Sequence, residues 1–202
     1  MWRCLVLQGQ ENVQRCILLT LFNRGLLKKK DRAKSGFSAP QGAISSRQPS
    51  TIARATKFGA YVYEDGTKYI GDWNDRGRKH GLGHVQLKDN TRYEGGFSNG
   101  LCSGLGVLQY PDGARYEGEF MEGWFHGHGM FWRADGMKYE GQFRGGRIWG
   151  LGLVTFKDGS HGLPRHEGFF KDCKFVQKKK CPSVVIDAQR AALMARIQTE
   201  QT

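Results

Sequence analysis

The sequence lacks several features that would point to secretion, to membrane insertion or to a fibrous structure. It has only 5 prolines in 202 residues and no strict glycine at every third position, which excludes a collagen-like chain. Its 5 cysteines are an odd number without a Cys-x-x-Cys pair, which argues against a disulfide framework and against a zinc site. No apolar run approaches the ~20 residues that a membrane-spanning helix needs. These absences favour a protein of the reducing cytoplasm.

Motifs that carry chemistry are also scarce. No Gly-x-Gly-x-x-Gly opens a predicted helix, and no phosphate-loop lysine follows a glycine pair. His126 and His128 can point to the same side of one strand, but no carboxylate or cysteine completes a usual metal-ligand set beside them. We therefore expect no enzymatic activity, no bound metal and no cofactor.

The positive charge is placed unevenly along the chain. The formal net charge is +12, yet residues 57–170 contain fourteen basic and fourteen acidic residues. The excess therefore lies in residues 1–56 and 171–202. A nucleic-acid-binding domain needs a basic face on its folded part, so we expect no nucleic acid as a partner. The basic ends allow at most a weak contact with anionic membranes.

Glycine is abundant, at 29 residues, and it follows an internal repeat. The template reads Asp-Gly-x-x-Tyr-x-Gly-x-aromatic and is followed by a Gly-x-Gly pair. Its spacing is 24 residues once and then 23. A constant period of this size is typical of a repeat array. Five units begin at Asp65, Asp89, Asp112, Asp135 and Asp158.

Each unit predicts a β-hairpin. Asp-Gly between two alternating runs is a strong hairpin-turn signal, in which both central residues are expected to have positive φ. After the turn, the Tyr, the Gly and the second aromatic residue share one strand face, and the Glu beside the Tyr lies on the other. Five units in series predict an all-β fold with an elongated, single-layer antiparallel sheet. The apolar stripe of such a sheet needs curvature, a helix or a partner to cover it.

An aromatic-lined groove on this sheet is the candidate binding site. Such a surface suits an extended or helical peptide. For Met130 and Trp132 two interpretations stay open, an exposed interaction surface or cover by the C-terminal helix. The predicted protein-binding residues are Tyr93, Phe97, Tyr116, Phe120, Met130, Trp132, Tyr139 and Phe143.

Two terminal regions flank the array, which we place at residues 57–176. Within the basic C-terminal unit, residues 177–202, a helix is predicted over 183–198 with Ser183 as its N-cap. We expect this helix to pack over the last hairpin and cover its edge, with partner binding as the alternative. Residues 1–56 are expected to form a disordered basic extension, with a mitochondrial targeting segment as the alternative.

The repeat units resemble a known family. The Tyr-Glu-Gly-x-Phe units at Tyr93, Tyr116 and Tyr139, each followed by Gly-x-Gly, are similar to MORN repeats (membrane occupation and recognition nexus). The insertion in the fifth unit and the helical tail after it are similar to short retinophilin-type MORN proteins. The resemblance implies a non-catalytic adaptor that binds the tail of a class III myosin in actin-rich cell projections.

Three functions compete for this sequence. The first is a protein-binding adaptor, the second a membrane-surface module that uses the basic tails, and the third a structural unit that assembles through the ends of its sheet. The neutral repeat region argues against the second. For the third, the predicted helix guards one end of the sheet, while the half-unit that begins at Gly59 is less protected. We therefore favour the adaptor and expect a monomer or weak self-association.

Overall fold

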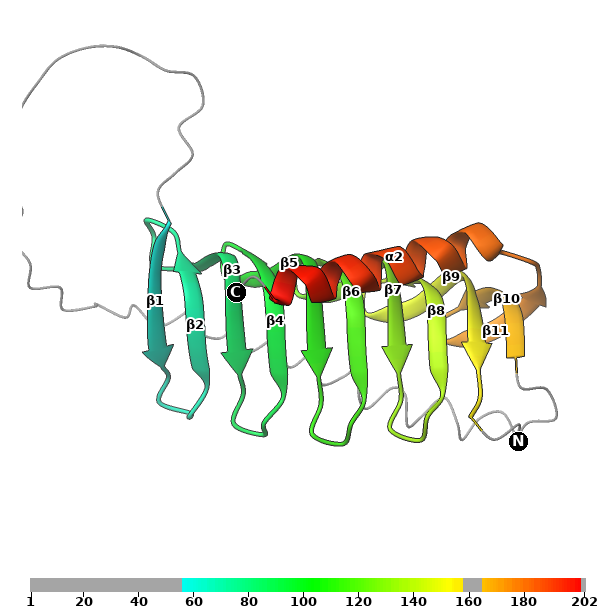
Figure 1. Cartoon of the computed structure of the whole chain (residues 1–202), viewed down its shortest axis with the longest axis horizontal. Coiled ribbons are helices and arrows are strands. Elements are labelled where there is room, and N and C mark those ends of the chain that lie inside the picture. The colour runs from blue at the N-terminus through cyan, green and yellow to red at the C-terminus, as the bar shows by residue number, and fades with distance from the viewer. Residues whose placement is uncertain (1–55, 158–164, 201–202) are drawn as a thin grey trace, which may run out of the picture.

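The computed structural model describes residues 56–157 and 165–200, which form one open antiparallel sheet with a single helix laid across it (Figure 1). This architecture confirms the predicted all-β, single-layer fold with one C-terminal helix. The helix is α2 (Pro182–Thr199). The strands are β1 (Lys57–Val62), β2 (Lys68–Trp73), β3 (Lys79–Gln86), β4 (Arg92–Ser98), β5 (Leu101–Gln109), β6 (Arg115–Met121), β7 (Trp124–Trp132), β8 (Lys138–Arg144), β9 (Arg147–Thr155), β10 (Arg165–Lys171) and β11 (Lys174–Lys178).

The order of strands in the sheet is the order of the chain, from β1 to β11. Each repeat contributes two neighbouring strands, so every strand pairs with the strands that precede and follow it in sequence. The described sheet does not close on itself and therefore has two edges, β1 and β11.

Two kinds of turn occur along the sheet, and they alternate from β3 to β9, whereas the β1–β2 and β2–β3 turns are both of the longer kind. The Asp-Gly turn is not of the predicted kind. Only the residue after the Asp has positive φ, as at Gly66 (88°) and Asn90 (66°). The carboxylate of Asp65 accepts a hydrogen bond from the amide of Thr67 at 3.0 Å, which orders the turn locally. The expectation that both central residues have positive φ is wrong here, because this is a longer turn that ends in one left-handed residue.

The tight two-residue turns lie at the opposite ends of the strands. Asn99 and Gly100 have φ values of 51° and 95°, and Glu122 and Gly123 have 51° and 85°, as a type I′ turn requires. The amide of Gly123 donates to the carbonyl of Cys102 in the preceding hairpin at 2.8 Å. These turns therefore also link neighbouring hairpins. Glu122 is a poor sequence signal for such a turn, because glutamate rarely adopts positive φ.

The helix runs back along the sheet instead of covering its last edge. Its bounds lie close to the predicted 183–198, but it begins after Cys181 with Pro182 in the first turn, so Ser183 is not the N-cap. α2 contacts β4 to β9, mainly β5 to β8, and Figure 1 shows it lying across these strands. The prediction that it covers the edge of the last hairpin is therefore wrong, since β11 is still an edge of the described sheet.

Two sequence predictions concern residues outside the described part of the chain. They are the basic extension, of which residues 1–55 are not described, and the insertion of the fifth unit at 158–164. Both stay predictions.

Candidate functional site

The aromatic residues of the repeats form a continuous ladder on one side of the sheet. The ring of Tyr93 lies edge-on to Phe97 of its own unit, with centroids 5.1 Å apart, and to Phe120 of the next unit at 5.0 Å. Pairs with this geometry are favourable beyond the area that they bury. The same arrangement recurs from Tyr69 to Phe170. The ladder therefore joins successive repeats into one core.

Hydrogen bonds and glycines hold each tyrosine in the ladder. The hydroxyl of Tyr116 donates to the carbonyl of Glu119, and that of Tyr93 donates to the carbonyl of Gly96, both at 2.8 Å. A Cβ atom placed on Gly106 would lie 2.7 Å from the ring of Tyr93, which is closer than real contacts allow. The second Gly of the Gly-x-Gly pair is therefore needed for the ring to pack down on the neighbouring strand.

The six predicted binding rings are part of this core. None of them is more than 5% exposed, so they pack against one another and do not line an open groove. The sequence pattern predicted their common face correctly, but it did not reveal that adjacent units bring their rings together. Their role in partner binding stays a prediction, and in this structure they hold the sheet in shape. They are Tyr93, Phe97, Tyr116, Phe120, Tyr139 and Phe143.

The opposite face of the sheet carries one continuous row of side chains, which we call the transverse row. The strand register places Glu94 beside Val107, Val107 beside Glu117, and Glu117 beside Met130. Over most of the row, glutamates on even-numbered strands alternate with apolar residues on odd-numbered strands. The row consists of Ala60, Ile70, His84, Glu94, Val107, Glu117, Met130, Glu140, Leu153 and Glu167.

Helix α2 covers the C-terminal part of the transverse row with small side chains. Ala188 and Ala192 are fully buried against Met130, and Trp132 packs beside them. Alanine loses no side-chain entropy on burial, and its short side chain lets a helix approach the sheet closely. Of the two interpretations that the sequence left open for Met130 and Trp132, the structure supports cover by the helix.

Buried glutamates of the row contact the polar side chains of α2. Glu140 accepts a hydrogen bond from the Gln189 amide at 2.8 Å. Glu117, only 2% exposed, is paired with Arg115 at 3.5 Å and with Arg196 at 3.4 Å. Burial raises the pKa of Glu117, and the two guanidinium groups oppose that rise. Because desolvation offsets much of the gain from a buried ion pair, we interpret these contacts as fixing the position of the helix.

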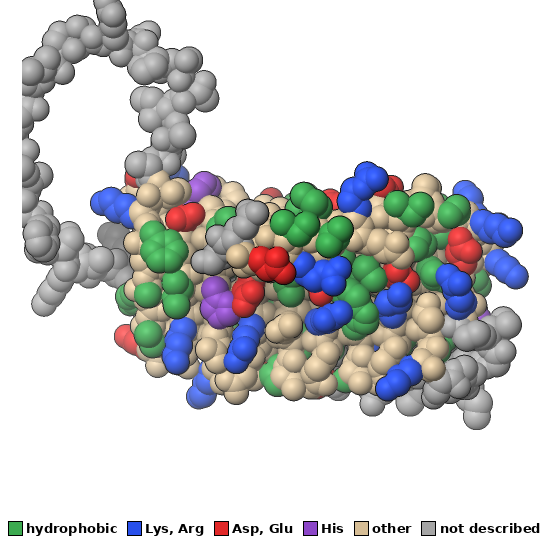
Figure 2. Space-filling view, viewed as in Figure 1, with side chains coloured by type: hydrophobic (Ala, Val, Ile, Leu, Met, Phe, Trp, Pro, Cys, Tyr) green, Lys and Arg blue, Asp and Glu red, His purple; other side chains and the backbone are tan. Residues whose placement is uncertain are grey.

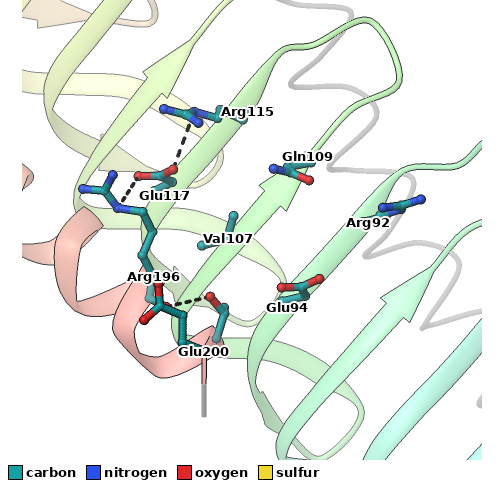
Figure 3. A pocket seen from close by; sticks show the side chains of 9 residues that line it. Arg92, Glu94, Val107, Gln109, Arg115, Glu117, Arg196 and Glu200 are labelled. Carbon is teal, nitrogen blue, oxygen red and sulfur yellow. Dashed lines mark hydrogen bonds and ion pairs between the residues drawn. The ribbon is translucent and has the colours of Figure 1, made fainter. Parts of the chain in front are cut away.

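A pocket of about 210 Å³ opens where α2 ends (Figure 3). Figure 3 shows Arg115 and Arg196 reaching Glu117 from two sides, while Glu94 and Arg92 lie on the far wall. Acidic and basic groups therefore alternate around the opening, which suits the charged side chains of a peptide. The lining residues are Arg92, Glu94, Val107, Gln109, Arg115, Glu117, Arg196, Thr199 and Glu200.

Beyond the pocket, the transverse row is not covered by α2. Ile70 is 46% exposed, and it occupies the position that a glutamate has in the later repeats. The next residue of the row, His84, lies with its Nδ1 atom 2.9 Å from the Glu94 carboxylate, and both side chains are partly exposed. Sequence analysis placed the repeat glutamates on this face and proposed Met130 and Trp132 of the same face as binding residues, but it did not identify the uncovered stretch around Ile70 and His84 as part of a site. The sequence feature that could have revealed the site is the glutamate that follows the tyrosine in each central repeat, because neighbouring residues of a strand lie on opposite faces.

The described residues offer little for catalysis. None of them form a group of three or more His, Cys, Asp or Glu side chains that could hold a metal ion. Burial raises the pKa of the Cys102 thiol to about 12, so it is no nucleophile at neutral pH. The residues around Ser98 match the sequence pattern Gly-x-Ser-x-Gly. Ser98 lies at a strand-to-strand hairpin, however, whereas a nucleophile elbow needs a strand-to-helix turn. In the described ranges, we find no helix with the length and apolarity to cross a membrane.

Comparison with known proteins identifies the repeat. The family model of the MORN repeat matches residues 69–92, 93–115, 116–138 and 139–161. A relative from Drosophila melanogaster, described as "MORN repeat-containing protein 4 homolog", is 67% identical over 153 residues. The match covers 76% of this chain and 77% of the relative. The similarity therefore extends over most of both chains.

Proposed function

This chain belongs to the MORN-repeat family, and on that premise we propose that it is a non-enzymatic adaptor which binds a segment of another protein across the transverse row. The observation that carries the proposal is α2 itself, a polypeptide segment that lies across the row and is held by alanines and by Glu117 and Glu140. A face that accepts a helix of its own chain has the shape and chemistry to accept a similar segment from a partner.

The dimensions of the sheet leave room for such a segment. Strands lie ~4.8 Å apart, and one helical turn rises ~5.4 Å, so a helix that crosses the sheet places about one turn over each strand. The 18 residues of α2 extend about 27 Å, in agreement with contacts from β4 to β9. Beyond β4, the last strand that α2 contacts, the sheet extends about 15 Å further to β1, enough for roughly three helical turns or a short extended segment.

The uncovered part of the row also indicates what kind of segment fits. Ile70 offers an apolar contact, and the His84–Glu94 pair and the pocket offer charged ones. We therefore expect an amphipathic segment with an apolar side chain over Ile70 and a basic side chain near Glu94. Met130 and Trp132 take part only if the partner reaches under or displaces α2.

For the partner we propose the tail of a class III myosin, and for the location the cytoplasm of actin-rich cell projections. The resemblance to retinophilin-type MORN proteins supports this assignment, because it implies that partner. The neutral charge of the repeats and their polar pocket are compatible with a peptide ligand.

The proposal is tested by titrating the full chain with a class III myosin tail in a calorimeter. Ile70→Asp and Glu94→Lys change exposed positions of the row, and Val176→Asp on β11, which is 59% exposed, is the matched control. We expect each row variant to weaken binding about tenfold or more, equivalent to ~1.4 kcal/mol, and the control to bind like the parent. If the tail binds the row variants as tightly as the parent, the row is not the site. If the tail does not bind the parent at all, the partner assignment is wrong.

A second candidate function is contact with an anionic membrane surface. It is supported by exposed lysines gathered at the β11 end of the sheet. Each basic residue near such a surface contributes ~1 kcal/mol. We expect liposomes rich in phosphatidylserine to sediment the parent but not a variant with these lysines changed to Gln, if this function holds. The lysines are Lys171, Lys174, Lys178, Lys179 and Lys180.

A further inference from the structure

The first strand of the sheet presents an apolar edge. Phe58 is 69% exposed and Val62 is 64% exposed, and with Ala60 they point to the same face of β1. Figure 2 shows hydrophobic side chains gathered over β1 and β2 at this end of the molecule. No strand lies beside the outer side of β1 within residues 56–157 and 165–200.

The hydrogen-bonding groups on this edge follow from the hairpin that joins β1 to β2. The amide of Tyr63 donates to the carbonyl of Thr67 at 2.8 Å, so the main-chain groups of Tyr63 point toward β2. Because these directions alternate along an antiparallel strand, the amide and carbonyl groups of Phe58, Ala60 and Val62 point away from β2. The edge therefore offers three consecutive sites for pairing with another strand.

We propose that two copies of this chain pair through β1, antiparallel and centred on Ala60. The two-fold axis then stands perpendicular to the sheet, so each residue of one copy meets a residue of the same face in the other. Ala60 lies opposite Ala60 of the second copy, and Phe58 lies opposite Val62. Each of these pairs exchanges two backbone hydrogen bonds, and all the outward groups of the edge are used.

The side chains of β1 fit this register on both faces. On the face of the transverse row, Phe58 and Val62 pair across the interface, and aromatic residues pair well with β-branched ones. On the other face, Tyr61 of one copy, which is 48% exposed, lies opposite Gly59 of its mate. Glycine leaves room for a ring, as Gly106 does for Tyr93 inside the sheet.

Charges favour the same pairing and disfavour the other edge. The register brings Lys57 of one copy beside the Glu64–Asp65 turn of its mate. The β11 edge instead carries Lys174 and Lys178, and more lysines flank it on both sides. Lysines on an edge strand are a common protection against pairing. β1 has one lysine, no proline and no register shift in its pairing with β2, so it lacks this protection.

Pairing through β1 would join the sheets of the two copies into one longer sheet, whose central part carries the transverse rows of both copies on the same face. The uncovered stretches of the two transverse rows meet at the interface, and each is bounded by its own α2. The pairing does not require the proposed partner, because its hydrogen bonds come from the backbone edge of β1, whereas the partner is expected to contact the side chains of Ile70 and Glu94 and the pocket.

Sedimentation velocity on the full chain, over a series of concentrations, tests the proposal. We expect a concentration-dependent species of twice 22.8 kDa. Ala60→Pro removes an outward amide without touching the β1–β2 ladder, since edge strands tolerate proline at such positions. It should weaken the dimer about 30-fold, as the loss of two backbone hydrogen bonds predicts. Val62→Lys tests the side-chain contact should Ala60→Pro fail to fold, and Val176→Lys on β11 is the matched control.

The possible outcomes separate the pairing modes. A dimer that both β1 variants weaken and the β11 variant leaves unchanged supports the proposal. A monomer at all concentrations, or a dimer indifferent to both β1 variants, overturns it. Longer polymers that variants at either edge disrupt would show head-to-tail pairing of β1 with β11, and would also overturn it.

Discussion

A lysine buried in the aromatic core provides the sharpest test of the energetics. Lys79, in β3, is 6% exposed, and its ammonium group lies 5.0 Å from the ring centroid of Tyr63 and 5.3 Å from that of Tyr69. Burial lowers the pKa of Lys79 to about 8, although the negative charge of Asp65 opposes this shift. The Lys79 ammonium group therefore loses its proton more readily in the folded chain than in the unfolded chain.

The sign of the pH dependence follows from this difference. An unfolded lysine has a pKa of ~10.4, so between pH ~8 and pH ~10.4 the unfolded state binds more protons, and stability rises with pH. Below pH ~8 the amine is charged in both states, and the folded state bears the full cost of burying it. A shift from 10.5 to about 8 corresponds to at most about 3 kcal/mol, at 1.36 kcal/mol for each pKa unit.

Lys79→Met removes the charge and keeps most of the side-chain volume. We expect the variant to be up to about 3 kcal/mol more stable than the parent near pH ~7, and this difference to vanish above pH ~10.4. Urea denaturation at several pH values measures both quantities, and Lys68→Met at an exposed position of β2 is the control. A variant that is less stable than the parent near pH ~7, or a difference that does not depend on pH, would refute the reasoning.

Further substitutions test the ladder and the helix contact. Gly106→Ala should cost about 1–3 kcal/mol in urea denaturation because the new Cβ meets the ring of Tyr93; unchanged stability would contradict the packing role of this glycine. Ala192→Leu should cost a similar ~1–3 kcal/mol, since Ala192 is fully buried, while Leu193→Ala on the exposed side of α2 should change stability by less than ~0.5 kcal/mol. Equal effects of these two variants would refute the assigned orientation of the helix. Deleting residues 181–202 should shift the fluorescence of Trp132 to longer wavelength as water reaches it, and an unchanged spectrum would contradict its cover by α2.

The fold could be predicted from the sequence because its determinants are local. The 23-residue period, the alternation of side chains and the turn residues each act over a few positions, and all strand pairs join chain neighbours. The same alternation placed Tyr116 and Glu117 on opposite faces, as the structure has them. The type of turn was harder to predict, because the Asp-Gly pair at residue 65 is compatible with more than one hairpin geometry, and Glu122 does not usually signal a left-handed residue.

The candidate site could be predicted only in part. The aromatic residues were assigned to one face correctly, but their exposure depends on neighbouring units, since the ring of Tyr93 is covered by Phe120 from the next repeat. The position of α2 depends on residues still farther away, because Ala192 packs on Met130 and Arg196 reaches Glu117. The residues of α2 and the residues of the sheet that they contact lie in separate segments of the sequence, so no single segment reveals that they fit together.

The sequence by itself therefore determined the repeats, the hairpins, their order and the approximate bounds of the helix. Tertiary structure alone decided that the rings are buried, that the helix lies across the sheet, and that the β1–β3 end of the transverse row is left uncovered. The physical reason is the difference in sequence distance between the interacting residues. Hairpin formation is governed by side chains a few residues apart, whereas burial and helix docking depend on a surface that exists only after many strands have assembled.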